Sequence, residues 1–486
     1  MLKAFFIGVD IGTQGARVNL IDEKGNLIAV GEKSFVLDDS SREEQSTQLW
    51  EEAFNESFDK MLKALPHDFD RSRIVSMGVT STSGTVIPMD KDWKPLHHAI
   101  MYSDKRSAPQ GQRCKEAAEK ANQNFTAFSF STGLAKMVWY SESYPEKASL
   151  IHKWIHAADF ITGKISGVWA VTDYTNAFKS GYDILNYSWP SYIYQELPIK
   201  KEWLPEVVAS GEVIGTIDPA FAANYNLPNT IKVVAGITDG CASQIAAGAI
   251  NPGEWNTTIG TTLVVKGVTE REIKDPLGRI YSHRHQLGFW MPGGASNTGA
   301  DWVTNEFGKD LELLNEYADK HLPGANLSYP LRQHGERFPF VAPEAEGFEQ
   351  ERLSYEERFL ANIEGVAYIE RYAYQVIQEL SGEKVKAVFT AGGASNSDAW
   401  LKIRSNVLNV PVYKMKHITG AFGAAILSAS RTFFKDITEA VKQLTQIEKE
   451  VCPEPGLSEQ YNQNFQRFLS LLEDKGYIKK EELNNA

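Results

Sequence analysis

Residues 7–13 (Ile-Gly-Val-Asp-Ile-Gly-Thr) and residues 258–265 (Thr-Ile-Gly-Thr-Thr-Leu-Val-Val) decide how the fold of this chain is interpreted. Each is an apolar, β-branched run interrupted by Gly-Thr, and one lies in each half of the 486 residues. A glycine between two strand-forming runs permits a tight hairpin with a positive φ, here at Gly12 and Gly260. Bare backbone beside a hydroxyl also lets a phosphate accept N–H and O–H hydrogen bonds. Either stretch alone is typical of an ordinary hairpin, whereas the pair favours a polyphosphate site.

The composition is that of a globular protein with an acidic balance of charge. Hydrophobic residues make up 42% and charged residues 23%, and the length of 486 residues predicts two or three domains. The net charge of −12 argues against a general binder of nucleic acid or of anionic membranes. A local site can still oppose the global charge and bind a small phosphorylated ligand.

Cysteine usage and hydropathy favour a cytoplasmic protein without a membrane segment. Cys114, Cys241 and Cys452 are widely spaced, which argues against a disulfide framework or a zinc site. The apolar run at the N-terminus is short and ends at Asp10 without a small-residue cleavage site, so it predicts a first strand and no signal peptide. The other apolar stretches fall short of the roughly 18–20 residues needed to span a bilayer.

The order of the predicted elements is typical of an α/β protein. Hydrophobic patterning predicts a helix at 50–65 and five strands, at 5–10, 17–22, 27–35, 74–79 and 86–90. We expect the first three strands to form an antiparallel meander and the last two to pair with each other. Three antiparallel strands, a helix and a further strand are the opening of an RNase H-like or actin-like domain.

The same meander begins again halfway along the chain, with strands at 255–259 and 262–268. This repeat predicts a boundary near residue 250, with one domain over 1–250 and a second over 251–486 that ends in a charged helical tail. Strands alternate with helices in the second half, including a long amphipathic helix at 356–379, which implies a parallel core.

Two aspartates follow strands at points where chemistry could take place. Asp10 ends the first strand beside the first Gly-Thr turn, where it could hold Mg²⁺ or simply bond its own backbone in the turn. Arg17, on the next strand, could brace Asp10 or a phosphate, or lie on the surface. Asp239 lies between a buried strand and a helix of small residues, so it could cap that helix or act as a general base.

Three further segments offer polar groups to a ligand. Residues 391–396 (Ala-Gly-Gly-Ala-Ser-Asn) could let adenine lie on bare backbone, or form a tight turn in which Asn caps a helix. Residues 80–85 place five hydroxyls around Gly84, which suits a polyol and also suits an edge turn. Asp104 could accept two sugar hydroxyls or pair with Arg106.

Four blocks of the sequence resemble, in order, those of the FGGY carbohydrate kinases. They are residues 10–13 with Arg17, residues 236–239, residues 259–262, and residues 390–396 with Trp400. The resemblance runs across nearly the whole chain. It implies two actin-like domains around a central cleft, with ATP mainly on the second domain and the sugar mainly on the first.

The resemblance also implies roles for single residues. Asp239 would be the catalytic base, and Asp10 would belong to a magnesium site. Together with the placements above, we expect ATP to be contacted by Gly12, Thr13, Arg17, Gly260, Thr261, Thr262, Gly392, Gly393 and Asn396. We expect the sugar to be contacted by Thr82, Ser83, Gly84, Asp104 and Asp239.

The segment that faces the sugar distinguishes members of this family. Glycerol kinases carry Arg-Glu where this chain has Ser83-Gly84, and typical bacterial xylulokinases carry Met-His there. Residues 82–85, 102–104, 172–177 and 293–299 look most like the D-ribulose kinase branch. We therefore expect an ATP- and Mg²⁺-dependent kinase for the terminal hydroxyl of a ketopentose, either D-ribulose or, as the alternative, D-xylulose.

A protein of another class remains as a rival interpretation. A non-catalytic actin-like nucleotide switch or sugar sensor would share the fold but would not need a base at Asp239. We expect a small-molecule sugar as the partner, with no nucleic acid and no membrane, and a homodimer is compatible with the sequence.

Overall fold

The computed structural model describes residues 4–122 and 128–479, and it divides into two compact units. Unit 1 comprises residues 1–246, 286–288 and 417–445, and unit 2 comprises residues 247–285, 289–416 and 446–486. The units are therefore not consecutive halves of the chain, because residues 417–445 from the predicted second domain belong to unit 1.

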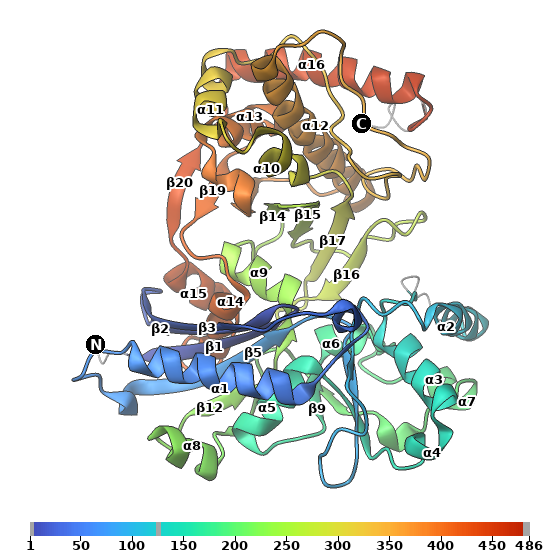
Figure 1. Cartoon of the computed structure of the whole chain (residues 1–486), viewed down its shortest axis with the longest axis vertical. Coiled ribbons are helices and arrows are strands. Elements are labelled where there is room, and N and C mark those ends of the chain that lie inside the picture. Colours follow the sequence, from blue (N-terminus) through green and yellow to red (C-terminus); the bar gives the residue numbers. More distant parts are fainter. Residues whose placement is uncertain (1–3, 123–127, 480–486) are drawn as a thin grey trace. The chain divides into compact units, whose positions relative to one another are not determined.

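Unit 1 is built on a mixed seven-stranded sheet (Figure 1). The strand order is β11-β12-β5-β1-β2-β3, and β13 also pairs with β5. The bounds are β1 Phe5–Gly12, β2 Gly15–Asp22, β3 Leu27–Ser34, β5 Ile74–Ser81, β11 Val213–Thr216, β12 Lys232–Val234 and β13 Ile237–Thr238. Strands β1 to β3 are antiparallel and β5 is parallel to β1, which confirms the predicted meander and the strand that follows it.

The two faces of β1 contact different helices, as the two-residue period of a strand requires. Ile7 and Val9 point into a core with α1 (Thr47–Lys63) and α5 (Ala157–Ser166). On the other face, Gly8 lets α14 (Gly420–Ala429) approach so closely that a Cβ would collide with the backbone of that helix. This close packing explains why α14 belongs to unit 1.

Unit 1 also contains two smaller sheets and further helices. A four-stranded sheet has the order β4-β7-β6-β8, and β9 pairs with β10. The strands are β4 Glu44–Gln45, β6 Val86–Met89, β7 Ala99–Ile100, β8 Lys153–His156, β9 Val171–Asp173 and β10 Glu206–Val208. The helices are η1 Asp39–Arg42, η2 Arg71–Arg73, α2 Ala108–Lys120, α3 Gly133–Ser143, α4 Pro145–Ala148, α6 Tyr174–Phe178, α7 Tyr192–Gln195, η3 Lys201–Trp203, α8 Pro219–Tyr225, α9 Asp239–Ala247 and α15 Ile437–Leu444.

The expected pairing of residues 86–90 with the strand at 74–79 is wrong. Strand β6 pairs with β7 and β8, whereas β5 has β1 on one side and β12 and β13 on the other. Both edges of β5 are thus occupied, so the chain turns away at Gly84, which has a φ of 84°.

Unit 2 repeats the same design with its own seven-stranded sheet. The order is β16-β17-β15-β14-β18-β19-β20, with antiparallel β14, β15, β17 and β16 and with β18 and β19 parallel to β14. The strands are β14 Glu254–Ile259, β15 Leu263–Gly267, β16 Tyr281–Arg284, β17 Trp290–Ser296, β18 Ala387–Ala391, β19 Val412–Met415 and β20 Ile447–Val451. The predicted repeat of the meander is confirmed.

The helices of unit 2 enclose its largest core. They are α10 Asp301–Phe307, α11 Leu311–Lys320, α12 Tyr355–Ser381, η4 Gly393–Asn396, α13 Asp398–Leu408 and α16 Pro455–Asp474. Helix α12 begins at a capping box formed by Ser354 and Glu357 and ends at Gly382 in the left-handed conformation. The expected helical tail is α16, whose buried face contributes Tyr461 and Phe468 to this core. No helix in residues 4–122 or 128–479 has both the length and the apolar character that crossing a bilayer requires.

Candidate active site

The carboxyl ends of three strands meet at one edge of the unit 1 sheet. In the parallel pairing of β1 with β5, Asp10 lies opposite Thr80, and in the pairing of β13 with β5, Thr238 lies opposite Ser81. Asp239 follows directly and begins α9. The sequence-predicted residues Asp10 and Asp239 therefore share one edge with the 80–85 segment, where ligands bind in open α/β sheets.

The two aspartates are close enough to influence each other's charge. The pKa of Asp10 is raised from 3.8 to about 7, mainly because the carboxyl is buried and also because of the charge of Asp239, while the charge of Arg17 opposes both effects. Asp239 Oδ1 accepts a hydrogen bond of 2.7 Å from the backbone N–H of Gly240. A magnesium ion prefers one or two carboxylates together with phosphate oxygens, and a divalent cation would relieve this repulsion, so Asp10 and Asp239 fit that group.

A cavity of about 570 Å³ opens beside Asp10, lined also by Gly12, Thr13 and Arg17. Arg17 pairs with Glu32 at 2.8 Å, so its charge lies near Asp10 without a direct bond to that carboxylate. Gly12 lies opposite Gly15 in the β1–β2 hairpin, which leaves Thr13 at the turn. All four sequence-predicted residues are thus gathered around one cavity.

Gly12 and Gly260 do not have the positive φ that the sequence predicted. Both have φ values outside the left-handed region. Among the described residues, a Cβ on Gly12 would meet only the Gly15 carbonyl at 3.7 Å, and a Cβ on Gly260 would meet no atom within 4 Å. The turns therefore do not need glycine for their own conformation. The absence of a side chain at Gly12 and Gly260 still leaves room for a ligand to approach the backbone.

The 80–85 segment, Asn176 and Thr238 contain buried side-chain oxygens without a hydrogen-bond partner in the described part of the chain. Among the described residues, no hydrogen-bond partner is found for Ser81 Oγ, Ser83 Oγ, Thr238 Oγ1 or Asn176 Oδ1. Ser81 and Thr238 face each other in the β5–β13 register, and the N–H of Thr238 donates to Thr175 Oγ1 on α6 beside Asn176. Buried polar groups are almost always hydrogen-bonded, so this cluster fits a polar ligand.

Hydrogen bonds within the 80–85 loop and from Tyr102 fix the conformation of this loop. Thr82 Oγ1 and Thr85 Oγ1 lie 2.9 Å apart, and the N–H of Tyr102 donates to Thr85 Oγ1 at 3.2 Å. Gly84 has a positive φ, and a Cβ there would collide with the carbonyl of Ser131. Glycine is therefore required at this position, where the chain must turn tightly.

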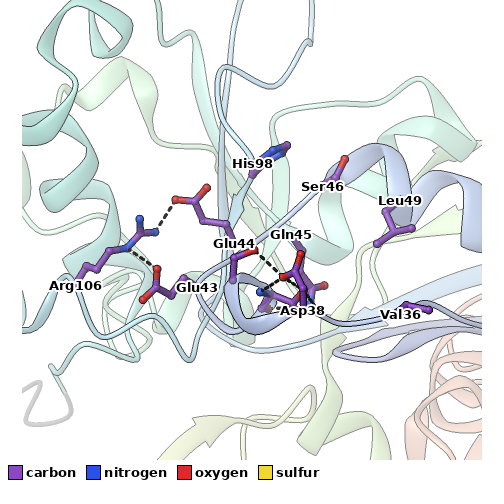
Figure 2. Close-up of a pocket in the computed structure, with 11 residues that line it drawn as sticks. Val36, Asp38, Glu43, Glu44, Gln45, Ser46, Leu49, His98 and Arg106 are labelled. Carbon is purple, nitrogen blue, oxygen red and sulfur yellow. Dashed lines mark hydrogen bonds and ion pairs between the residues drawn. The ribbon is translucent and has the colours of Figure 1, made fainter.

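Asp104 pairs with Arg106, which is the simpler of its two sequence interpretations. The Asp104 carboxylate is fully buried and accepts bonds of 3.0 and 2.8 Å from Arg106 Nε and Nη2. Figure 2 shows Arg106 directed also toward Glu43 and Glu44, beside a cavity of about 450 Å³. A contact between Asp104 and a sugar stays a prediction.

Two residues that contact the site were not found by sequence reasoning. Gln45 Nε2 donates to the carbonyl of Thr13 at 3.0 Å, and Gln45 Oε1 accepts from Trp50 Nε1 at 2.8 Å. A Cβ on Gly420, at the start of α14, would lie 2.5 Å from Asp10 Oδ2. Both contacts join segments far apart in the sequence, and no local signal marks them.

In unit 2, two predicted loops leave neighbouring strands. Residues 260–262 connect β14 to β15, and residues 392–396 follow β18, which is parallel to β14. Gly392 has a φ of 88°, and a Cβ there would lie 2.5 Å from the carbonyl of Ile259, so these loops pack tightly at their bases. Gly393, by contrast, would place a Cβ in open space.

Asn396 does not cap the following helix, which was the alternative role for this residue. The cap is Ser397, whose Oγ accepts from the N–H of Trp400 at 3.1 Å. Asn396 is exposed and lines a cavity of about 880 Å³ together with Asn315 and Glu316 of α11. It is therefore placed where it could contact a ligand of unit 2.

Comparison with known proteins identifies the family. Residues 5–246 match the N-terminal domain of the FGGY family of carbohydrate kinases, and residues 255–431 match its C-terminal domain. A xylulose kinase of Bacillus subtilis (strain 168) is 25% identical over 99% of this chain and 98% of its own length. A gluconokinase of Bacillus licheniformis is 24% identical over 97% and 96%. The crystal structure of a ligand-bound xylulose kinase from Lactobacillus acidophilus covers 97% of this chain and 98% of its own, with 22% identity and a TM-score of 0.84. The chain therefore belongs to the FGGY family of carbohydrate kinases, phosphotransferases that use ATP with Mg²⁺.

Proposed function

We propose that this carbohydrate kinase phosphorylates the terminal hydroxyl of a ketopentose and prefers D-ribulose. The observation that carries the proposal is the cluster of buried oxygens on Ser81, Ser83, Asn176 and Thr238, which have no protein partner within the described residues. An unsatisfied buried hydroxyl costs about 1–3 kcal/mol, which a substrate rich in hydroxyl groups would recover. The cluster lies at the strand end that Asp239 follows.

Asp239 is proposed as the group that activates the sugar. A carboxylate there would accept the proton of the attacking hydroxyl and hold its oxygen toward the γ-phosphoryl group. The N-terminus of α9 begins at Asp239 and favours the negative charge that develops nearby. Asp10 would hold Mg²⁺ with the phosphates of ATP, and the ion would neutralise charge on the transferred group.

The nucleotide is proposed to bind to three backbone segments. Residues 12–13 and 260–262 would contact its phosphates, with Arg17 nearby, and Gly392, Gly393 and Asn396 would contact its adenosine. The open space above Gly260 and Gly393 supports this assignment, because glycine at these positions has no conformational cause. Sugar contacts are proposed for Thr82, Ser83, Gly84 and Asp104.

The choice of pentulose rests on the loop around Gly84. Its positive φ and its contact with Ser131 exclude a bulky side chain, so the site cannot carry the Met-His or Arg-Glu pairs of other family members. D-xylulose is the alternative, and the relative named xylulose kinase supports it. We also propose a cytoplasmic location, since the three cysteines form no disulfide.

The test is a coupled assay of ADP release with D-ribulose, D-xylulose, gluconate and glycerol. We expect turnover with D-ribulose to exceed that with every other compound and glycerol to be essentially inert. Fastest turnover with D-xylulose would support the alternative, and fastest turnover with gluconate would show that the hydroxyl cluster was assigned to the wrong polyol.

A further inference from the structure

Unit 2 contains a fully buried ion pair that contacts Thr390, close to the end of the strand that leads into one of the two loops proposed to bind ATP. Arg404 of α13 donates from Nε and Nη2 to the two oxygens of Glu370 of α12, each at 2.7 Å. Neither side chain has exposed surface. The pair is bidentate, which fixes the plane of the guanidinium as well as its position.

The guanidinium of Arg404 also binds the hydroxyl of Thr390, which lies on the strand that precedes the 392–396 loop. Arg404 Nη1 donates to Thr390 Oγ1 at 2.5 Å, and this hydroxyl donates to the carbonyl of Thr257 at 3.2 Å. The Thr257 hydroxyl in turn lies 2.6 Å from the hydroxyl of Tyr374 on α12. Every member of this network is buried.

The network fixes the strand ends from which both loops begin. Thr390 and Thr257 face each other in the parallel register of β18 and β14. Gly392 follows two residues after Thr390, and Gly260 follows three residues after Thr257. A small shift of Thr390 along its strand would therefore move the residue 392–396 loop relative to the residue 260–262 loop.

Stability alone does not account for such a pair. Removing two charges from water is costly, and replacing a buried ion pair by apolar residues of similar volume is often neutral or stabilising. The ion pair of Arg404 and Glu370 would be needed if the function of the protein requires the end of β18 to stay in one register with β14. Lysine could not replace Arg404, because its single ammonium cannot reach Glu370 twice and Thr390 once in one plane.

We propose that Arg404 and Glu370 are positioning residues for ATP, which hold the adenosine loop at a fixed distance from the phosphate hairpin through Thr390. The proposal rests on the placement of ATP at residues 260–262 and 392–396. Loss of the pair should weaken the binding of ATP and leave the binding of sugar unchanged, because the sugar contacts are proposed in unit 1.

The main test is the double variant Arg404→Met with Glu370→Leu in the full-length enzyme. Because no charge is left unpaired, we expect its thermal unfolding midpoint to stay near that of the parent. We expect the KM for ATP to rise about tenfold, the factor that one lost hydrogen bond commonly produces, with the KM for sugar unchanged. A double variant that is folded and has the parental KM for ATP would overturn the proposal.

Two single variants separate positioning from folding. Thr390→Val keeps the ion pair and the strand but removes the hydroxyl, so it should also raise the KM for ATP. Arg404→Lys keeps the charge but cannot form all three hydrogen bonds of Arg404, so it should also raise the KM for ATP. A parental KM for ATP in either variant would contradict the proposed role of these three hydrogen bonds.

A control and a reference variant complete the experiment. Arg371→Met removes a neighbouring arginine of α12 that lies over Phe465 of α16, and it should leave the KM for ATP unchanged. Gly393→Val tests the ATP site itself, because a side chain there would meet only open space. If Gly393→Val leaves the KM for ATP unaltered, the placement of ATP is wrong. If Gly393→Val raises it and the double variant does not, only the positioning role fails.

Discussion

The proposed function gives different roles to Asp10 and Asp239, two carboxylates at one edge of the sheet. The pKa of Asp10 is raised to about 7 by burial and by the charge of Asp239, so it favours a proton or a cation. Asp239 begins a helix, where a negative charge is favoured. This asymmetry supports the assignment of Asp239 as base and of Asp10 as the cation site.

The first prediction is that Asp239→Asn abolishes nearly all phosphoryl transfer. Asparagine keeps the size and the bond from Gly240 but cannot accept a proton, and loss of a general base costs about 10²–10⁴-fold in rate. Steady-state kinetics measure the loss, and titration calorimetry should show unchanged ATP binding. Asp183→Asn, in an exposed turn of the same unit, is the control. Near-parental turnover by Asp239→Asn would remove the base assignment.

The second prediction concerns the stability of the metal-free protein as a function of pH. The ordinary pKa of an aspartate is 3.8, whereas the pKa of Asp10 in the folded protein is about 7. Between these two pH values the folded protein therefore retains a proton that the unfolded chain has released. Stability from this group is full below about pH 4 and is lost as the pH rises through about 7. Asp10→Asn cannot titrate, so relative to the parent it should gain stability over this interval, by at most a few kcal/mol.

Thermal unfolding in the presence of a chelator at pH 5 and pH 8 checks this prediction. The midpoint of Asp10→Asn minus that of the parent should be larger at pH 8. An equal difference at both pH values would show that Asp10 is ionised throughout.

The third prediction concerns a hydroxyl without a partner. Ser81→Ala removes a buried oxygen that bonds to no described residue, so the unfolding midpoint should not fall. The KM for the sugar should rise about tenfold if that oxygen contacts the substrate. Ser141→Ala is the control, since its hydroxyl already donates to the Met137 carbonyl at 2.8 Å. An unchanged KM for sugar in Ser81→Ala would place the substrate elsewhere.

At the level of elements, the Gly260 hairpin is open where a ligand could approach. The fourth prediction is that Gly260→Val folds normally but has a raised KM for ATP, because its φ is ordinary and its Cβ would occupy empty space. Gly456→Val provides a matched control, since Gly456 also has an ordinary φ and no neighbour within 4 Å of a Cβ. Kinetics with ATP and with sugar varied separately measure the effect. Equal KM values for ATP in the two variants would remove the hairpin from the site.

Elements with local signals could be predicted from the sequence. The two meanders follow from alternating β-branched runs, and α12 follows from its helical spacing between Ser354 and Gly382. The pairing of β6 could not be predicted, because it depends on β5 having neighbours on both sides. The expectation of a positive φ at Gly12 and Gly260 was wrong, since a Gly-Thr turn can form without a positive φ.

At the level of the whole molecule, short motifs could be predicted from the sequence, whereas contacts between distant segments could not. The family blocks marked Asp10, Asp239 and the glycine loops, because each lies in a short, recognisable motif. The contacts of Gln45 with Thr13 and of Arg404 with Glu370 join segments that only the fold brings together. The same holds for α14, which reaches unit 1 from residues 420–429 because Gly8 leaves room for it.

The proposed preference for D-ribulose rests on the smallest of these features. D-ribulose and D-xylulose differ in the orientation of one hydroxyl, so a site built for one leaves a buried polar group unpaired with the other. That mismatch costs roughly 1–3 kcal/mol, which corresponds to about a tenfold to hundredfold preference. We propose that the tight loop around Gly84 and the buried oxygens of Ser81 and Ser83, which have no partner among the described residues, are the source of this discrimination.

The ratio of kcat/KM for D-ribulose to that for D-xylulose, measured at saturating ATP and Mg²⁺, decides whether this kinase prefers D-ribulose. The position of the phosphate on the product, determined by NMR, accompanies the ratio. We expect a ratio of about ten or more and a phosphate on the terminal carbon. A ratio at or below one would contradict the assignment of D-ribulose and leave the chain a carbohydrate kinase of another preference.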